Sequence, residues 1–434
     1  MLGFLGLGSL DELYDSIPKA LRLDRELRLS APKSEVDVIE EMEAYADKNS
    51  PVGRSLVCFA GGGAYDHDLY SAVRMLGNRG EFVTAYTPYQ PEVAQGVLQA
   101  LFEYQTLISR LSGLPVSNAS LYDGASALVE AVNLACAKTG RRRVVISEAV
   151  NPNYRQVLDT FAKGPGHEIQ TAPVSKDGFT IWPDAAKDIA AYVVAYPNYL
   201  GVIEDIETVK SLSVDSGSLL IVAYDPVAVS VCKSPGELGA DVAIAEGQAL
   251  GVPLSFGGPY LGLFSTTKEL VRYLPGRLVG QTVDTGNQVA YVTTLRAREQ
   301  DIRREKASSN VCTNQTLMAI WTAIHLSWLG KGGFKQLGVA SLSSRVYLTN
   351  ELAKANVGTL LENSSTFREF PLHISKPTHQ VISDMMEFGF LAGVALDEGV
   401  GLDSFADSLI IATTEKRTKS QIDSYVNSLS KVLS

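Results

Sequence analysis

The sequence predicts an α/β protein with a large, mostly parallel sheet, followed by a smaller α/β domain at the C-terminal end. Between residues 143 and 245, apolar runs typical of buried strands alternate with helical patterns, which implies parallel strands joined by right-handed crossovers. Residues 218–224 are continuously apolar, as in a strand that is buried on both faces. After Val357, short strand patterns alternate with two helical patterns, which indicates the smaller domain.

The first part of the chain is predicted to be a helical arm. Ser9 is followed three residues later by a glutamate, the spacing of a capping box, and Ser34 precedes a helical run that is rich in glutamate. These helices are too short to bury their apolar faces alone. We therefore interpret residues 1–75 as an arm that lies on the main body or on a partner, residues 76–315 as the large domain, and residues 316–434 as a helical connection and the small domain.

The elements of the two domains follow from hydrophobic periodicity. Strands are predicted over residues 143–147, 168–172, 190–196, 218–224 and 241–245. Helices are predicted over residues 94–111, 122–139, 151–163, 204–216, 315–329, 337–353, 378–388 and 419–432. Residues 274–314 are expected to be a long irregular stretch, which in a compact domain is usually functional or disordered.

Composition excludes several classes of function. Apolar residues make up 45% and charged residues 20%, as in a soluble globular protein. No apolar run approaches the ~20 residues that span a bilayer, and the N-terminus lacks the basic flank of a signal peptide, so we expect a cytoplasmic protein. The net charge of −10 argues against nucleic acid as a partner. The four cysteines and five histidines lack metal-ligand spacing, so no metal is predicted.

Two predicted strands end beside polar residues. Asp225 follows the strand 218–224, and Glu246, Gly247 and Gln248 follow the strand 241–245. Ligands of open α/β sheets bind at the carboxyl ends of the strands. We therefore expect Asp225 and Gln248 to border one crevice.

This arrangement resembles the fold type I (aspartate-aminotransferase-like) enzymes that use pyridoxal phosphate (PLP). In that fold an acidic residue pairs with the pyridine nitrogen, a role that Asp225 matches, and a lysine just after the next strand holds the cofactor as a Schiff base. The position of that lysine is occupied here by residues 246–249, which contain none; Lys233 comes too early and Lys268 too late. The scaffold is predicted, without its covalent anchor.

Six motifs narrow the resemblance to the glycine cleavage system P-protein family, in its α-subunit (subunit 1) form. They occur in order as YTPYQPE (86–92), ASLYDG (119–124), YPN (196–198), EGQ (246–248), SFGGPY (255–260) and RREKA (303–307). The resemblance implies that the lysine lies on a homologous β subunit, in an αβ or α2β2 assembly. The complex would use PLP on the β subunit to decarboxylate glycine and would pass the aminomethyl group to the lipoyl group of H-protein. The chain alone would be inactive.

Two residues depart from a working cofactor site of this fold. The turn at residues 122–127 corresponds to the loop that holds the cofactor phosphate, and Asp123 places a negative charge there, so we interpret it as a helix N-cap. Asn151 occupies the place of an aromatic residue or histidine over the cofactor ring, and an amide stacks less well. We therefore regard Asp225, Gln248, Asp123 and Asn151 as vestigial cofactor positions.

Three further residues are candidates for the edge of a shared active site. Tyr86, Tyr89 and Gln90 lie in an extended segment, because each proline there disfavours helix in the residue before it. Two tyrosines and an amide could position glycine or the lipoyl arm without a change in charge. The alternative is a plain surface loop.

A basic cluster is the second candidate for such an edge. Arg303, Arg304 and Lys306 lie just before Ser309 and Asn310, which the fold resemblance places at the dimer interface. The cluster is either a solvated surface or a site for an anion, which would be an acidic surface of the β subunit or H-protein, or the glycine carboxylate.

Two other functions stay open. The chain could be an independent PLP-dependent aminotransferase or lyase that uses Lys233 or Lys268, against which their spacing argues. It could also be a structural or regulatory pseudoenzyme without catalytic consequence. Fold alone does not decide among these readings, because this scaffold hosts many chemistries.

Overall fold

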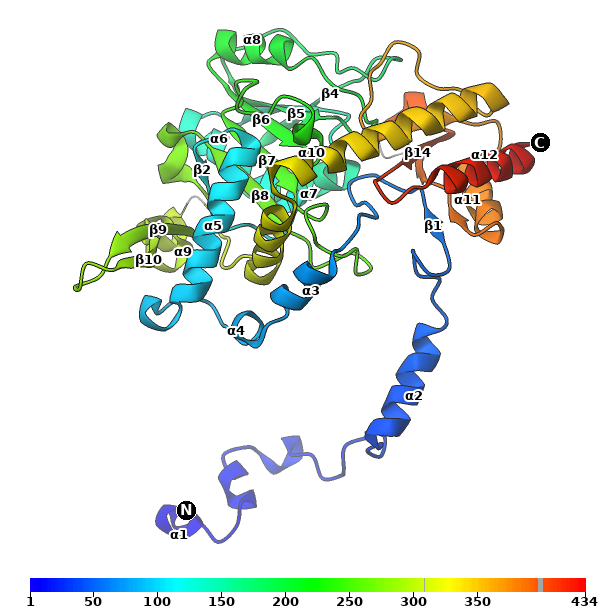
Figure 1. Ribbon diagram of the computed structural model, residues 1–434. Coiled ribbons are helices and arrows are strands. Elements are labelled where there is room, and N and C mark those ends of the chain that lie inside the picture. Colours follow the sequence, from blue (N-terminus) through cyan, green and yellow to red (C-terminus); the bar gives the residue numbers. More distant parts are fainter. Residues whose placement is uncertain (308, 397–400) are drawn as a thin grey trace. The chain divides into compact units, whose positions relative to one another are not determined.

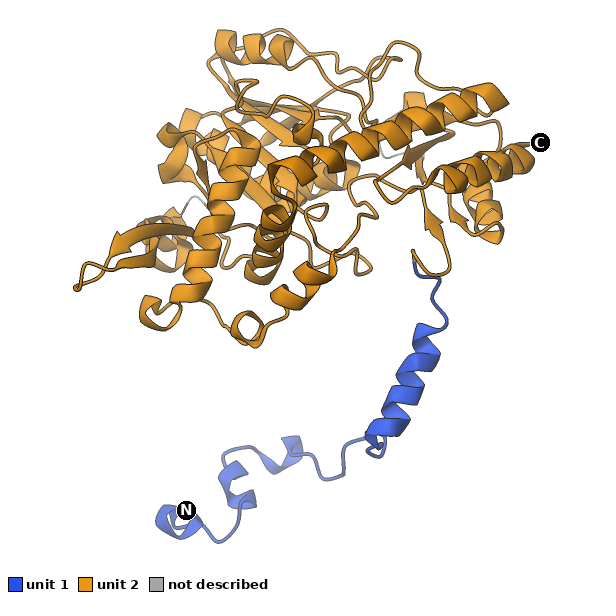
Figure 2. Cartoon of the chain, viewed as in Figure 1, with its two compact units in different colours: residues 1–51 blue, residues 52–434 orange. Residues whose placement is uncertain are grey.

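The structure is a computed structural model that describes residues 1–307, 309–396 and 401–434. The chain divides into two compact units, residues 1–51 and residues 52–434 (Figure 2). None of the described helices combines the length and the apolar character that crossing a bilayer requires. Each unit is described by itself below.

The first unit is a string of short helices without a core. It contains α1 (Leu2–Leu5), η1 (Asp11–Tyr14), η2 (Lys19–Leu21) and α2 (Glu35–Ala46). The predicted helix after Ser34 is confirmed: the Ser34 hydroxyl accepts a hydrogen bond from the backbone N–H of Asp37 at 3.2 Å, in a complete capping box. The predicted helix near Ser9 is only the single 3-10 turn η1. No residue of this unit is fully buried, so its apolar side chains have no core to join.

The second unit is built on a seven-stranded sheet with the order β2-β8-β7-β6-β5-β3-β4 (Figure 1). The five central and outer strands β7, β6, β5, β3 and β4 are parallel, which confirms the mostly parallel sheet. β8 and β2 run antiparallel to their neighbours, because β8 returns beside β7 without a crossover helix. The strands are β2 (Val116–Ser117), β3 (Arg143–Ser147), β4 (Glu168–Ala172), β5 (Ile189–Tyr196), β6 (Leu219–Tyr224), β7 (Val242–Glu246) and β8 (Gly262–Thr266).

Helices cover both faces of this sheet, which explains why its strands are apolar throughout. Alternate residues of β5 enter two cores: Tyr192 and Val194 lie in one, and Ala191 and Val193 in the other. Side chains of α5 (Gln95–Ser112), α8 (Ile206–Ser216) and α10 (Thr316–Ala355) fill the first core. Side chains of α6 (Gly124–Thr139) and α7 (Pro152–Ala162) fill the second.

The helix α10 leads from the large sheet to the small C-terminal layer (Figure 1). The sequence predicted two helices here with a break at residues 330–333, and the structure confirms the break: α10 consists of two helices that meet at a kink at Gly330, where φ is 59° and ψ is −178°. The small antiparallel sheet has the order β11-β14-β13 and carries α11 and α12. The elements of this C-terminal layer are β11 (Glu369–His373), α11 (Thr378–Glu387), β12 (Phe390–Leu391), β13 (Val394–Leu396), η8 (Asp403–Phe405), β14 (Ser408–Ala412) and α12 (Lys419–Leu433), of which β12 pairs outside the three-stranded sheet.

Residues 52–75, which the sequence assigned to the arm, lie in the second unit. The strand β1 (Val57–Cys58) pairs in parallel with β12, and the ring of Phe59 stacks on Tyr425 with 4.0 Å between centroids. This segment then leads to α3 (Ser71–Gly77), α4 (Gly80–Val83) and η3 (Pro91–Val93). The division of the second unit at residue 315 stays a prediction.

The stretch 274–314, expected to be irregular, contains a regular hairpin. The strands β9 (Leu278–Val283) and β10 (Val289–Thr294) pair antiparallel across a turn that begins at Asp284. Two short helical turns follow, α9 (Gln300–Arg303) and η7 (Arg304–Lys306). The remaining 3-10 turns are η4 (Ala228–Ser230), η5 (Lys268–Tyr273) and η6 (Arg296–Arg298).

Candidate functional site

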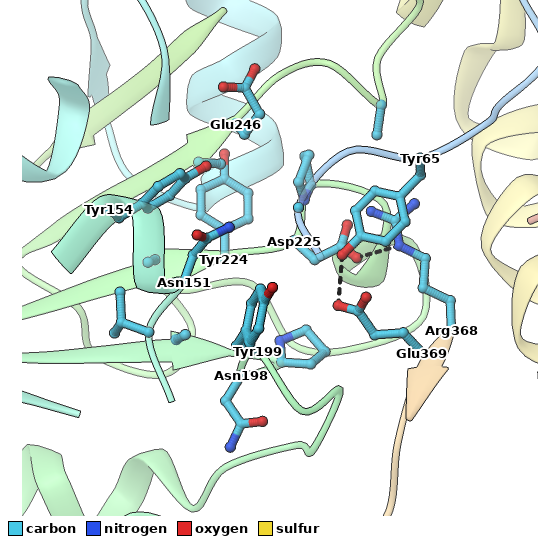
Figure 3. A pocket seen from close by; sticks show the side chains of 18 residues that line it. Tyr65, Asn151, Tyr154, Asn198, Tyr199, Tyr224, Asp225, Glu246, Arg368 and Glu369 are labelled. Carbon is cyan, nitrogen blue, oxygen red and sulfur yellow. Dashed lines mark hydrogen bonds and ion pairs between the residues drawn. The ribbon is translucent and has the colours of Figure 1, made fainter. Parts of the chain in front are cut away.

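A pocket lies at the carboxyl ends of β5, β6 and β7, where the fold predicts a ligand site (Figure 3). Its cavity has a volume of about 80 Å³. The large sheet contributes residues after three strands, and β11 of the small sheet contributes its first residue and the one before it. The labelled lining residues are Tyr65, Asn151, Tyr154, Asn198, Tyr199, Tyr224, Asp225, Glu246, Arg368 and Glu369.

Asp225 is already paired with a cation of its own chain. Its Oδ2 lies 2.7 Å from Nε of Arg368, and its Oδ1 accepts the backbone N–H of Val227 at 2.8 Å. The guanidinium of Arg368 also lies over the ring of Tyr65, 3.4 Å from the centroid, and contacts Nε2 of His67. The Arg368 side chain is 2% exposed. The acidic side chain that the sequence assigned to a pyridine nitrogen is therefore neutralised within the chain.

Glu369 lies beside this pair and is held by two donors. Its Oε1 accepts the hydroxyl of Tyr65 at 2.6 Å, and its Oε2 accepts the backbone N–H of Gly62 at 3.0 Å. Burial raises the pKa of Glu369 to about 7, although both donors act in the opposite direction. Burial, followed by the charge of Glu369, also raises the pKa of Tyr65 above its usual range.

Glu246 is the last residue of β7, and its side chain reaches the turn that leads into α6. Its carboxyl oxygens accept three backbone N–H groups, those of Gly124, Gln248 and Leu261, each at 3.0 Å. Burial raises the pKa of Glu246 to about 7. Asp123, by contrast, turns back onto its own helix and accepts the N–H of Ser126 at 2.7 Å, which confirms the predicted N-cap. The carboxyl group that meets the first amide of α6 is thus that of Glu246.

Gln248 and Asn151 are also engaged within the chain. Gln248 is 2% exposed: its Oε1 accepts the N–H of Tyr65 at 2.8 Å, and its Nε2 donates to the carbonyls of Tyr65 and Val252. Asn151 lines the cavity and donates to the carbonyl of Gly62 at 3.0 Å. Asp225 and Asn151 therefore border the crevice as expected, whereas Gln248 is not among its lining residues.

These residues do not fit pyridoxal phosphate. The amides that would receive a phosphate already bind Glu246, and the acid for the ring nitrogen already binds Arg368. Among the described residues that line the cavity, none is a lysine. We therefore derive no chemical step through this cofactor in this pocket.

The other predicted site residues lie away from this pocket. Tyr86, Tyr89 and Gln90 line a separate surface hollow beside η3, where the side chain of Tyr86 is 84% exposed. The guanidinium of Arg277 lies 5.6 Å from the ring centroid of Tyr89. The sequence analysis placed these three residues at the edge of a site shared with a partner subunit, and that role stays a prediction.

The basic cluster is a surface feature. Arg303, Arg304, Lys306 and Asn310 are all exposed, and none of them lines the pocket of Asp225. The ion pair nearest in sequence joins Arg296 to Asp301 at 3.1 Å. Among the described residues, no carboxylate lies within 4 Å of the charged nitrogens of Arg303, Arg304 or Lys306.

Sequence reasoning missed Arg368, Glu369 and Glu246 as site residues. Arg368 and Glu369 stand at the start of a strand of the other sheet and belong to no motif that the analysis used. Glu246 could have been found from the sequence. An acidic residue at the end of a buried strand needs hydrogen-bond donors, and glycine-rich turns near it in the sequence can supply backbone N–H groups.

The sequence of the chain matches a known protein family and its members. A family model described as glycine cleavage system P-protein matches residues 1–429. Two similar relatives are both called probable glycine dehydrogenase (decarboxylating) subunit 1. The one from Chlorobium luteolum is 44% identical over 437 residues and covers 100% of this chain and 97% of its own. The one from Desulforamulus reducens is 42% identical over 427 residues, 98% of this chain and 95% of its own.

The structure of the chain is also similar to solved structures, one of them from the same family. The crystal structure of glycine decarboxylase (P-protein) of the glycine cleavage system in inhibitor-bound form matches with a TM-score of 0.94 at 38% identity, over 100% of this chain and 97% of that one. A sphingosine-1-phosphate lyase from Burkholderia pseudomallei matches with a TM-score of 0.68 at 15% identity, over 95% and 92% of the two chains. The second likeness shows the fold alone, and it confirms the predicted fold type I.

Proposed function

Because the chain belongs to the glycine cleavage system P-protein family, we propose that it is subunit 1 of a glycine dehydrogenase (decarboxylating) whose cofactor-bearing site a second, homologous subunit completes. The two relatives described above are named as that subunit, and the chain matches almost their whole length. The division of labour rests on the pocket of Asp225, where Glu246 binds the amides and Arg368 binds the carboxylate that the cofactor would need. The cofactor is therefore assigned to the partner.

In this proposal the chain shapes a site that it does not contain alone. PLP on the partner subunit supplies the electron sink for the decarboxylation of glycine. The hollow of Tyr86, Tyr89 and Gln90 offers two hydroxyls, an amide and aromatic surface. Such groups can orient a small zwitterion or the lipoyl arm of H-protein and exclude water from it. The assembly is αβ or α2β2, and its location is cytoplasmic.

An independent PLP enzyme is a weaker reading of the same chain. It needs Lys233 or Lys268 at the cofactor, and neither lines the pocket; Lys268 begins η5, beyond β8. A purely structural subunit is the third reading. This reading predicts that substitution of Tyr89 and Gln90 leaves the activity of the complex unchanged, whereas our proposal predicts a loss.

The test is co-expression with the homologous subunit 2, followed by borohydride reduction and mass measurement of each chain. We expect the two chains to elute together, the reduced cofactor on subunit 2 alone, and glycine decarboxylation only in the mixed complex. Light scattering of that complex separates αβ from α2β2. Reduced cofactor on this chain, or separate elution at micromolar concentration, would remove the basis of the proposal.

A second measurement separates a shared site from a structural role. The double variant Tyr89→Ala/Gln90→Ala, in an intact complex, is expected to lose about tenfold or more in glycine decarboxylation, the scale of one misplaced positioning group. Phe161→Ala, which removes an exposed aromatic ring from α7, is the matched control and should leave the activity unchanged. Full activity of the double variant would favour the structural reading.

A further inference from the structure

Three backbone amides from three separate segments point at one carboxyl group. The N–H of Gly124 opens α6, the N–H of Gln248 follows β7, and the N–H of Leu261 precedes β8. We call these three amides the amide nest. Convergent N–H groups at the start of a long helix form a site for anions, because their dipoles add at that point. In this chain the acceptor at that point is the carboxyl group of Glu246.

The surroundings leave room for one occupant. A Cβ on Gly124 would lie 2.1 Å from the hydroxyl of Tyr154, and a Cβ on Gly262 would lie 2.5 Å from the carbonyl oxygen of Asp123. A Cβ on Gly247 would lie 2.9 Å from the side chain of Leu261. The glycines therefore let the walls of the amide nest close around the carboxyl group. A phosphate could enter only if that carboxyl group left.

We propose that the carboxyl group of Glu246 is a resident acceptor that fills the amide nest and excludes phosphate-bearing ligands, so that removal of this group turns the nest into a phosphate site. Without that group, three buried donors would lack an acceptor, and a phosphate oxygen is the strongest replacement that solution offers. This inference concerns the chain's own pocket and holds whichever subunit carries the cofactor.

The first test compares Glu246→Ala with the natural chain, each as the full chain, by thermal unfolding in millimolar inorganic phosphate. Sodium chloride keeps the ionic strength constant. Phosphate is expected to raise the melting temperature of Glu246→Ala by about 2–4 °C and to leave the natural chain unchanged. Glu246→Gln, which keeps the volume and one acceptor oxygen, is the matched control and should also show no shift. An equal shift in the natural chain would mean that the amide nest is open, and would overturn the proposal.

The second test identifies the group that is bound. Equilibrium dialysis of Glu246→Ala should retain pyridoxal phosphate and not pyridoxal, and inorganic phosphate should compete. Retention of both would assign binding to the ring and contradict the proposal. If Glu246→Ala does not fold in either buffer, Glu246→Asp, which withdraws the carboxyl group by one methylene, takes its place. A folded variant that gains no phosphate stabilisation would show that the nest is not an anion site.

Discussion

At the scale of single residues, Arg368 decides the character of the pocket. Its guanidinium lies between the ring of Tyr65 and the carboxylate of Asp225, and its side chain is 2% exposed. A buried pair of this kind contributes little beyond two apolar residues of the same shape, but loss of one partner leaves the other charge buried and uncompensated. The pair therefore keeps Asp225 in place and unavailable to a ligand.

The first prediction concerns this pair. Arg368→Met is expected to lower the free energy of unfolding of the second unit by about 3–5 kcal/mol, because Asp225 remains as an unpaired buried charge. The double variant Arg368→Met/Asp225→Asn should recover a large part of that loss. Urea unfolding of the four proteins of this cycle measures the coupling. Additive losses in the double variant would contradict it.

The second prediction concerns pH and Glu369. Its pKa is raised from 4.5 to about 7 by burial, so the folded chain holds a proton that the unfolded chain releases. The stability from this group is complete below pH 4.5, falls as the pH rises to about 7, and is constant above. Glu369→Gln removes this dependence. The stability of the variant relative to the natural chain should rise by up to about 3 kcal/mol between pH 4.5 and 7.

Urea unfolding at a series of pH values checks this prediction, because groups that titrate identically in both proteins cancel in the difference. A difference that stays constant with pH would show that Glu369 titrates near its ordinary pKa. The comparison needs the hydrogen bond from Tyr65 in both proteins, and the amide oxygen of glutamine can accept it.

At the scale of elements, sequence reasoning located the buried strands and most helices, because the apolar residues of each element recur in one clear pattern. It placed β6 and β7 to within a residue or two of their bounds. It missed the hairpin of β9 and β10, whose residues do not alternate between buried and exposed, although Asp284 and Gly286 marked its turn. It divided α10 in two at the glycines of residues 330–333, and the structure confirms this break, because Gly330 leaves the helical conformation.

The third prediction uses the glycines of α10. Gly330→Ala is expected to destabilise the chain by about 1–3 kcal/mol, because φ of 59° with ψ of −178° is a conformation that essentially only glycine adopts. A Cβ there meets no atom within 4 Å, so the cost is backbone strain alone. Gly332→Ala is the control: it also meets no atom, its φ is not positive, and alanine should stabilise it by about 0.5–1 kcal/mol.

Thermal unfolding of the two variants measures the opposite signs. Equal effects would mean that the interruption at Gly330 is not required by the packing of α10 against the small sheet. A continuous straight helix would then fit both domains.

At the scale of the whole molecule, the site was harder to predict than the fold. Asp225 and Asn151 could be placed because they follow elements of the large sheet, and the ends of parallel strands meet at one edge. Arg368 and Glu369 could not, because they reach the pocket only through the packing of the small sheet on the large one. A contact between segments so distant in sequence leaves no periodic signal in either segment.

The fourth prediction concerns the basic cluster of Arg303, Arg304 and Lys306. Exposed cations without partners fit an electrostatic docking surface for H-protein better than a carboxylate site, which needs one fixed guanidinium. Arg303→Ala and Arg304→Ala should each raise the KM for H-protein about two- to fivefold at low salt, and less at high salt, with the KM for glycine unchanged. Lys331→Ala, an exposed cation of α10, is the control.

Steady-state kinetics of the reconstituted complex at several salt concentrations decides between the two roles. A KM for glycine that rises at every salt concentration would assign the cluster to the glycine carboxylate. An unchanged KM for both substrates in the double variant Arg303→Ala/Arg304→Ala would show that the cluster is only a solvated surface.

The first unit has a consequence for the life of the protein in a cell. Residues 1–51 expose leucines and valines, bury none of their side chains fully, and have no core that would resist a protease. In a cell, a protease is therefore expected to attack the chain first within residues 1–51, before it reaches the packed sheets of the second unit. Limited proteolysis followed by mass measurement of the fragments checks this order.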